Sequence, residues 1–262
     1  MYDINGNVLP TNETKKQISD ILLCNNLISH RGLNTAPENT IPALEEAIAA
    51  GYKHIEVDIN WTSDGVCVLL HDNTIDRTSD GSGSITSMTF ATASQYDFGS
   101  WKDEKYAGTK IPTLKETLLL AKANNVAVQL DIADTNKKPT DNNLQTMIDD
   151  IVDCGMMPYV NICCYPDRAQ KIISLCSDIN LTIGLGTYTI DQAAEMVKDC
   201  NFVCLSRQYS NYNDSLAVEA HKKGWKMQIW TINDVATANA NFLTGADWII
   251  TDSIIPSSLN DE

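Results

Sequence analysis

Five polar side chains of types suited to phosphate chemistry lie in three short stretches of the first third of the chain. They are His30 and Arg31 after the apolar run NLIS, Glu56 and Asp58 within HIEVDIN, and His71 at the end of VCVLL. Histidines exchange protons near neutral pH, carboxylates bind hard divalent cations, and arginine presents a planar fork to phosphate oxygens. The residue types predict acid–base chemistry on an anionic group.

Glu56 and Asp58 are alternate residues of an expected strand, so both carboxylates project to the same side. Two adjacent carboxylates raise each other's pKa unless a cation lies between them. Asp131, in VAVQLDI (126–132), has the parity to join them from a neighbouring strand. Three carboxylates predict a site for one divalent cation, Mg²⁺ or Ca²⁺.

The chain has four histidines, and two of them end strand-like runs. We expect His30 and His71 to be the catalytic acid–base pair, and Arg31 to contact phosphate. His54 opens the second expected strand and His221 lies on a helix face, so both are predicted to be structural or solvated.

Eight short apolar, β-rich runs alternate with amphipathic helical patterns. The runs are 27–29, 54–60, 126–132, 159–165, 180–186, 202–206, 226–232 and 247–252. Regular alternation indicates parallel strands joined by helices. Eight units, with no G-x-G-x-x-G after the first strand, favour a (β/α)8 TIM barrel of the α/β class over an open doubly wound sheet.

We predict a single barrel domain over 25–262, with a small insertion after strand 2 at about 61–112. Residues 1–24 form an N-terminal extension, in which QISDILL is expected to be a helix that caps the barrel floor. Chemistry in such barrels gathers at the carboxyl ends of the strands. Gln129 and Trp230 stand there and are predicted to bind substrate.

Composition limits the partners. The net charge of −15 argues against nucleic acid and anionic membranes. No run approaches the roughly 20 apolar residues of a transmembrane helix, and the absence of a signal-like segment predicts a cytoplasmic location. The opening YDINGNVLP also fits a piece of a larger or extracellular, phage-like assembly. The eight cysteines lack metal spacing and are expected to be reduced core thiols.

The ordered motifs resemble the glycerophosphodiester phosphodiesterase family. They are SHRGLNTAPENT, HIEVDINWTSDG, LLHDNTIDRTSDGSG, IPTL and WTIND with GADWIITD, and the resemblance covers about 27–256. It implies a barrel enzyme, a metal-dependent phosphoric diester hydrolase acting on a small or polymeric phosphodiester. The resemblance also implies that PENT (37–40) lines the entrance, which makes Glu38 a substrate-binding candidate. Asn39 or Thr40 is expected to cap the following helix.

The third strand departs from the family's E-I-K, since this chain has Asp131, Ile132 and Ala133. The lysine expected to help neutralise phosphate is missing. A lost charge-assisted contact is worth about 1.5–3 kcal/mol, which predicts a slower enzyme or a changed substrate. Lys137 or Lys138 could take its place, and Gln129 or Gln228 could supply neutral donors.

As a mechanism, we expect His30 to act as base and His71 as acid, with water or a substrate hydroxyl as nucleophile. The product is glycerol phosphate, released from a glycerophosphodiester or from a polymer such as teichoic acid. Two alternatives stay open. One is a phospholipase D-like enzyme acting on lipids, and the other is a catalytically degenerate barrel that binds glycans or teichoic acid.

Overall fold

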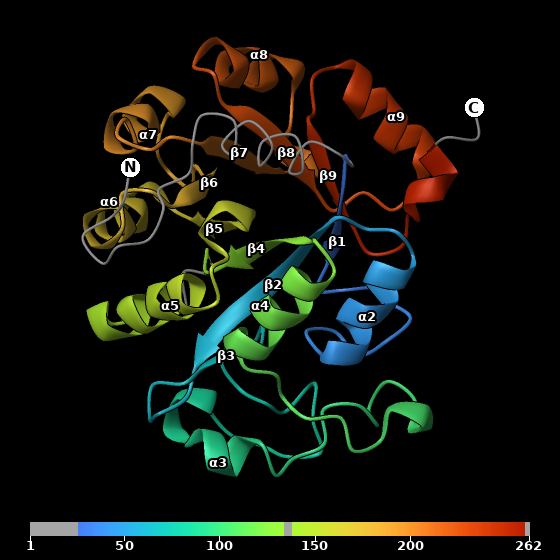
Figure 1. Cartoon of the computed structure of the whole chain (residues 1–262). Coiled ribbons are helices and arrows are strands. Elements are labelled where there is room, and N and C mark those ends of the chain that lie inside the picture. The colour runs from blue at the N-terminus through green and yellow to red at the C-terminus, as the bar shows by residue number, and fades with distance from the viewer. Residues whose placement is uncertain (1–25, 134–137, 260–262) are drawn as a thin grey trace.

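Eight parallel strands close into a barrel in the computed structural model, which describes residues 26–133 and 138–259 (Figure 1). β1 pairs with both β2 and β9, which completes the ring. The strands are β1 (Leu27–His30), β2 (His54–Trp61), β4 (Ala127–Asp131), β5 (Val160–Cys164), β6 (Asn180–Gly184), β7 (Val203–Gln208), β8 (Lys226–Trp230) and β9 (Trp248–Thr251). The predicted TIM barrel is confirmed, and each predicted strand is present.

Seven helices connect the described strands and surround the barrel (Figure 1). They are α2 (Ile41–Ala49), α4 (Leu114–Ala123), α5 (Asp141–Asp153), α6 (Pro166–Leu175), α7 (Ile190–Met196), α8 (Asp214–Lys222) and α9 (Val235–Leu243). Their starts are specified locally: Thr113, Thr140 and Thr189 each form a capping box with the residue three positions on. The apolar faces of the helices pack on the outward side chains of the strands.

The insertion after β2 begins with a hairpin that the alternation did not predict. β3 (Cys67–Leu69) runs antiparallel to the end of β2, pairing Ile59 with Leu69. The rest contains only one short helix, α3 (Phe90–Ala93), and two 3₁₀ turns at Ile85–Ser87 and Glu104–Tyr106. A small apolar cluster of its own holds the insertion together, as expected of a lobe that lies at one side of the barrel (Figure 1).

Polar side chains fill the barrel interior below its mouth. His54 is fully buried and its Nε2 lies 3.1 Å from Asn161 Oδ1. Asn161 in turn donates to Gln129 and to Thr182, at 2.9 and 2.6 Å. Burial lowers the pKa of His54 to about 4, so this ring is neutral at pH 7. His54 is a structural residue, as predicted, and His221 pairs with Asp247 on the surface at 2.8 Å.

Other expectations concern thiols, membranes and the terminus. Five of the seven cysteines that the structure describes are buried. Among the described helices, none has the length and apolar character needed to span a bilayer. The predicted floor helix in 1–24, Cys24 and Lys137 lie outside the described residues.

Candidate active site

The turn after β1 carries the first two site residues, and its backbone is unusual. Arg31 adopts a left-handed conformation, with φ of 59°. Its amide donates to both the carbonyl and the Oε2 of Glu56, at 2.9 and 3.1 Å. Gly32 follows because a Cβ there would lie 2.6 Å from the Cβ of Ala43. The H-R-G sequence is therefore what brings this turn against both β2 and α2.

Asn39 also has a left-handed backbone, and its side chain orients Asp58. Its amide donates to Asp58 Oδ2 at 2.8 Å and accepts from the Asp58 backbone at 3.0 Å. Of the two predicted cap residues, Thr40 is the N-cap of α2, but its side chain makes no capping hydrogen bond. The Thr40 hydroxyl donates to Pro37 O instead, and the structure uses Asn39 on a buried carboxylate.

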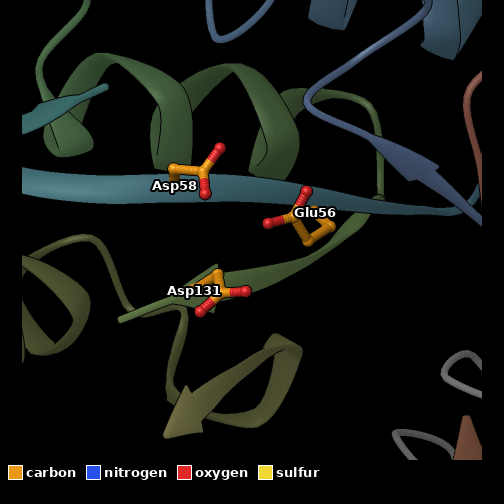
Figure 2. Close-up of side chains that lie close together, drawn as sticks. All are labelled: Glu56, Asp58 and Asp131. Atoms are coloured by element: carbon orange, nitrogen blue, oxygen red, sulfur yellow. The ribbon is translucent and has the colours of Figure 1, made fainter. Parts of the chain in front are cut away.

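Three carboxylates gather at the mouth of the barrel, on the paired strands β2 and β4 (Figure 2). One oxygen from each of Glu56, Asp58 and Asp131 lies within 4.8 Å of the others. Burial, and then the charge of Asp58, raise the pKa of Glu56 to about 8. A divalent cation would relieve this repulsion, and oxygen donors at this spacing suit Mg²⁺ or Ca²⁺. The residues fit the predicted cation site.

His30 is held by Asp252, the residue that follows the last strand of the barrel. Its Nδ1 lies 2.6 Å from Asp252 Oδ1, and Asp252 is fixed by two bonds to Asn233. Burial lowers the pKa of His30, but the Asp252 hydrogen bond and the charge of Glu56 outweigh it, so this pKa is raised above 6.5. Nε2 is the ring nitrogen left for a substrate.

His71 reaches the same mouth because β3 folds back along β2. The amide of Leu70 donates to the Asp58 carbonyl at 3.0 Å, so His71 follows level with the carboxylates. Its Nδ1 lies 2.6 Å from Asp72 Oδ1. Arg77 donates to Asp72 and, with His71, lowers the pKa of that carboxyl to about 2. Two histidines with the same Asp-held geometry thus flank the carboxylate cluster.

Arg31 and Glu38 belong to a chain of ion pairs rather than standing alone. Arg31 Nη1 donates to Glu38 at 2.9 Å, and its Nε lies 3.1 Å from Asp58 Oδ2. Glu38 also accepts from Arg77 at 2.7 and 2.8 Å. The Arg77 hydrogen bonds and the Arg31 charge overcome burial and lower the pKa of Glu38. Arg31 Nη2 has no partner among the described residues and remains available to a phosphate.

One pocket of about 390 Å³ brings most of the predicted residues together. Its lining includes His30, Arg31, Glu56, Asp58, His71, Gln129, Asp131 and Trp230. Glu38 lies outside it, in a smaller neighbouring pocket of about 120 Å³. Gln129 is buried and tied to Asn161, while Trp230 is 39% exposed. Lys138 is exposed and does not line either pocket.

Sequence reasoning did not assign the partners of the predicted residues. Asp252 directly follows the last strand, at the end of the motif GADWIITD, and no role was predicted for it. Asn39 was predicted to be a cap, and Arg77 lies in a polar loop without a strand pattern to mark it. Arg207, at the end of β7, was also missed although it lines the pocket. Two motifs could have pointed to these aspartates: H-D (71–72) contains Asp72, and W-I-I-T-D (248–252) ends at Asp252.

Comparison with known proteins shows one consistent family. The model of the glycerophosphoryl diester phosphodiesterase family matches residues 30–255. A Caldanaerobacter subterraneus glycerophosphodiester phosphodiesterase is 27% identical and covers 86% of this chain and 93% of its own. Mouse glycerophosphodiester phosphodiesterase 1 is 40% identical over 108 residues, and the chain spans about a third of its length (33%).

Solved structures agree on the fold. An Oleispira antarctica phosphodiesterase, solved with the product sn-glycerol-3-phosphate, superposes with a TM-score of 0.76 at 25% identity. The alignment covers 90% of this chain and 95% of that one. A structure from Silicibacter pomeroyi has the same TM-score at 21% identity, over 89% of this chain and 91% of the other.

Proposed function

The chain belongs to the glycerophosphoryl diester phosphodiesterase family, a family of phosphoric diester hydrolases, and on that premise we propose that it hydrolyses a glycerophosphodiester to an alcohol and glycerol phosphate. The proposal rests on one arrangement. Two Asp-held histidines flank a cluster of three carboxylates in a single pocket. Acid–base groups on two sides of a cation site are what cleavage of a phosphodiester requires.

The cation site has a defined set of residues. Glu56, Asp58 and Asp131 would hold one divalent ion, Mg²⁺ or Ca²⁺, which neutralises charge on the phosphoryl oxygens when bound. Asn39 and the Arg31 amide keep two of these carboxylates in place before any ion arrives. Ala133 contributes through its backbone, since its amide donates to Asp131 at 2.6 Å.

The remaining roles follow from the hydrogen-bond partners. Arg31 binds a non-bridging phosphate oxygen through its unpaired Nη2. His30 removes a proton from the nucleophile through Nε2, and Asp252 stabilises the imidazolium that results. His71 protonates the leaving alcohol, with Asp72 fixing its orientation. The nucleophile is either water or a hydroxyl of the substrate, and a cyclic phosphate among the products would identify the hydroxyl.

Gln129 and Trp230 are proposed to contact the rest of the substrate at the pocket wall. Glu38 is better placed to position Arg31 and Arg77 than to touch substrate, because both its oxygens accept from guanidinium groups. Glycerol-phosphate polymers are included among the proposed substrates, since the pocket is open to a chain that extends past the scissile bond.

The substrate is tested by a release assay with added Mg²⁺, Ca²⁺ or Mn²⁺. Glycerophosphocholine, lysophosphatidylcholine and a glycerol-phosphate polymer are compared side by side. We expect release from a glycerophosphodiester that stops when the cation is chelated. Release from lysophosphatidylcholine alone would favour the phospholipase D-like alternative. If none of the three substrates is cleaved, the alternative that remains is a catalytically degenerate barrel that binds glycans or teichoic acid.

The two histidines are tested by His30→Ala and His71→Ala. Each should lower kcat by about 10²–10⁴, because that is the usual contribution of a positioned acid or base. The matched control is His221→Ala, which removes an Asp-paired histidine outside the pocket and should leave kcat unchanged. Cation binding, measured by calorimetry, should persist in all three variants. Near-normal turnover in both pocket variants would overturn the assignment.

A further inference from the structure

Arg207 is an arginine of the pocket for which the described part of the chain supplies no ion pair. It lies near the end of β7, half-buried, and lines the same pocket as the carboxylate cluster. Its Nε is buried without a hydrogen-bond partner. Among the residues described here, Arg207 makes no ion pair, whereas Arg31 and Arg77 pair with carboxylates and Arg168 donates to the Ile132 carbonyl.

A guanidinium group that is partly buried without hydrogen-bond acceptors destabilises the folded protein. The chemistry of the group indicates which kind of ligand would supply those acceptors. A buried donor without an acceptor has lost its hydrogen bonds to water and gained none in return, so such groups in native proteins call for an explanation. Acidic residues are abundant in a chain of net charge −15, yet none of the described ones pairs with Arg207. Guanidinium binds phosphate and carboxylate oxygens in a bidentate manner. An anionic ligand would supply the missing acceptors.

The barrel places Arg207 far from the reacting phosphate. In the strand order, β7 is four strands from β2 in either direction round the ring, so the two strands lie opposite each other. Glu56 and Asp58 are on β2, and His30 is on the adjacent β1. The scissile phosphate must lie beside these residues. Arg207 therefore faces the opposite end of a substrate that fills the pocket.

We propose that Arg207 binds a second anionic group of the substrate, on the wall of the pocket opposite the carboxylate cluster. Gln208 and Asn211 accompany it there as neutral hydrogen-bonding groups, with Asn211 Nδ2 3.4 Å from Gln208 Oε1. The inference rests on the proposed function and narrows its substrate class. The preferred substrates are phosphodiesters that carry a further phosphate, either at the end of a small alcohol or along a glycerol-phosphate chain.

The test compares three substrates that differ in the second phosphate. Diglycerol phosphate has none, diglycerol phosphate with a terminal phosphate has one, and a short glycerol-phosphate polymer has several. We expect the wild-type protein to show a KM at least tenfold lower for one or both phosphate-bearing substrates. The substrate with the lower KM shows whether the second phosphate belongs to the end of a small alcohol or to a glycerol-phosphate chain.

Arg207→Gln should remove this preference, so that kcat/KM falls at least tenfold more for the phosphate-bearing substrates than for diglycerol phosphate. Arg207→Lys should restore part of it, since the charge returns without the fork. Lys115→Gln is the control for charge alone, because Lys115 pairs with Asp153 on the outer helices. An equal loss for all three substrates, or an unchanged preference in Arg207→Gln, would overturn the proposal.

A binding measurement separates this proposal from the proposed function. If the wild-type protein hydrolyses neither these three substrates nor glycerophosphocholine, the proposed function fails, but the anion site can still be tested. Calorimetry then compares glycerol 1,3-bisphosphate with glycerol 3-phosphate. Tighter binding of the bisphosphate, at least tenfold and lost in Arg207→Gln, supports the site. Equal binding of the two compounds excludes it.

Discussion

Two walls of the same pocket differ in how their polar groups are paired. On the side of β1, β2 and β4, nearly every ionisable group has a partner: His30 with Asp252, Asp58 with Asn39, and Arg31 with Glu38. We call this the paired wall. On the open wall, at the ends of β7 and β8, Arg207 has no ion pair with any residue that the structure describes, and Trp230 is 39% exposed.

Under the proposed function, this difference assigns the reaction to one wall of the pocket and recognition of the substrate to the other. Groups that transfer protons or hold a cation must keep one geometry, so their partners are supplied by the protein itself. Groups that recognise the variable part of a substrate can take their partners from the ligand. Under the proposed function, the paired wall would carry the reaction, and the open wall would recognise the variable part of the substrate.

The largest expected effect comes from breaking one pair on the paired wall. Asp252→Asn removes the acceptor that fixes His30, so kcat should fall on the order of 10³-fold. The pKa of His30 should also fall, because Asp252 raises it, and the acidic limb of the pH–rate profile of the remaining activity should move to lower pH. Asp247→Asn, which breaks the surface pair with His221, is the matched control. An unchanged rate in Asp252→Asn would show that the pairing is incidental.

A second test concerns the repulsion among the carboxylates. The pKa of Glu56 is raised to about 8 by burial and by Asp58, so the folded state holds a proton that the unfolded state releases above about 4.5. The free energy of unfolding of the metal-free protein should therefore fall by about 3 kcal/mol as pH rises from 5 to 8.

Glu56→Gln should abolish most of that fall, measured by urea denaturation in chelator. At pH 8, added Mg²⁺ or Ca²⁺ should stabilise the wild-type protein but not Glu56→Gln. Asp64→Asn serves as a control, since Asp64 is an exposed acid in the insertion. Equal stabilisation of both proteins by the cation would argue against Glu56 as a ligand.

The smallest expected effect comes from a substitution that tests whether the paired wall and the open wall have separate roles. Ala133→Lys returns a cation to the paired wall, where the family pattern has lysine. It should raise kcat/KM up to about tenfold, and equally for substrates with and without a second phosphate. Arg207 variants should change only the preference between them. If Ala133→Lys altered that preference, the two walls would not have separate roles.

Much of the barrel, and which polar residues gather at its mouth, could be predicted from the sequence. The strands are short apolar runs, and the helices between them carry their own threonine caps, so each element is specified by neighbouring residues. Glu56 and Asp58 could be paired because strand periodicity fixes their side. Asp131 followed from the same parity, and the register confirms that it lies beside Asp58.

The partners of those residues could not be predicted in the same way. Asp252 meets His30 only because β9 closes the ring beside β1, 222 positions away in sequence. Asn39 has the sequence signature of a helix cap, and its bond to Asp58 depends on how the first loop crosses β2. His71 is level with the carboxylates because β3 runs back along β2. The irregular sequence of the insertion does not predict this arrangement.

The sequence by itself determined the secondary structure, the barrel and the residue types of the reaction, because these depend on local periodicity and short spacings. The tertiary structure decided which charges are neutralised internally and which are left for a ligand. That depends on closure of the ring, which brings β9 to β1 and sets β7 opposite β2. Arg31 and Arg207 are both arginines at strand ends, and only their surroundings in the folded chain distinguish them.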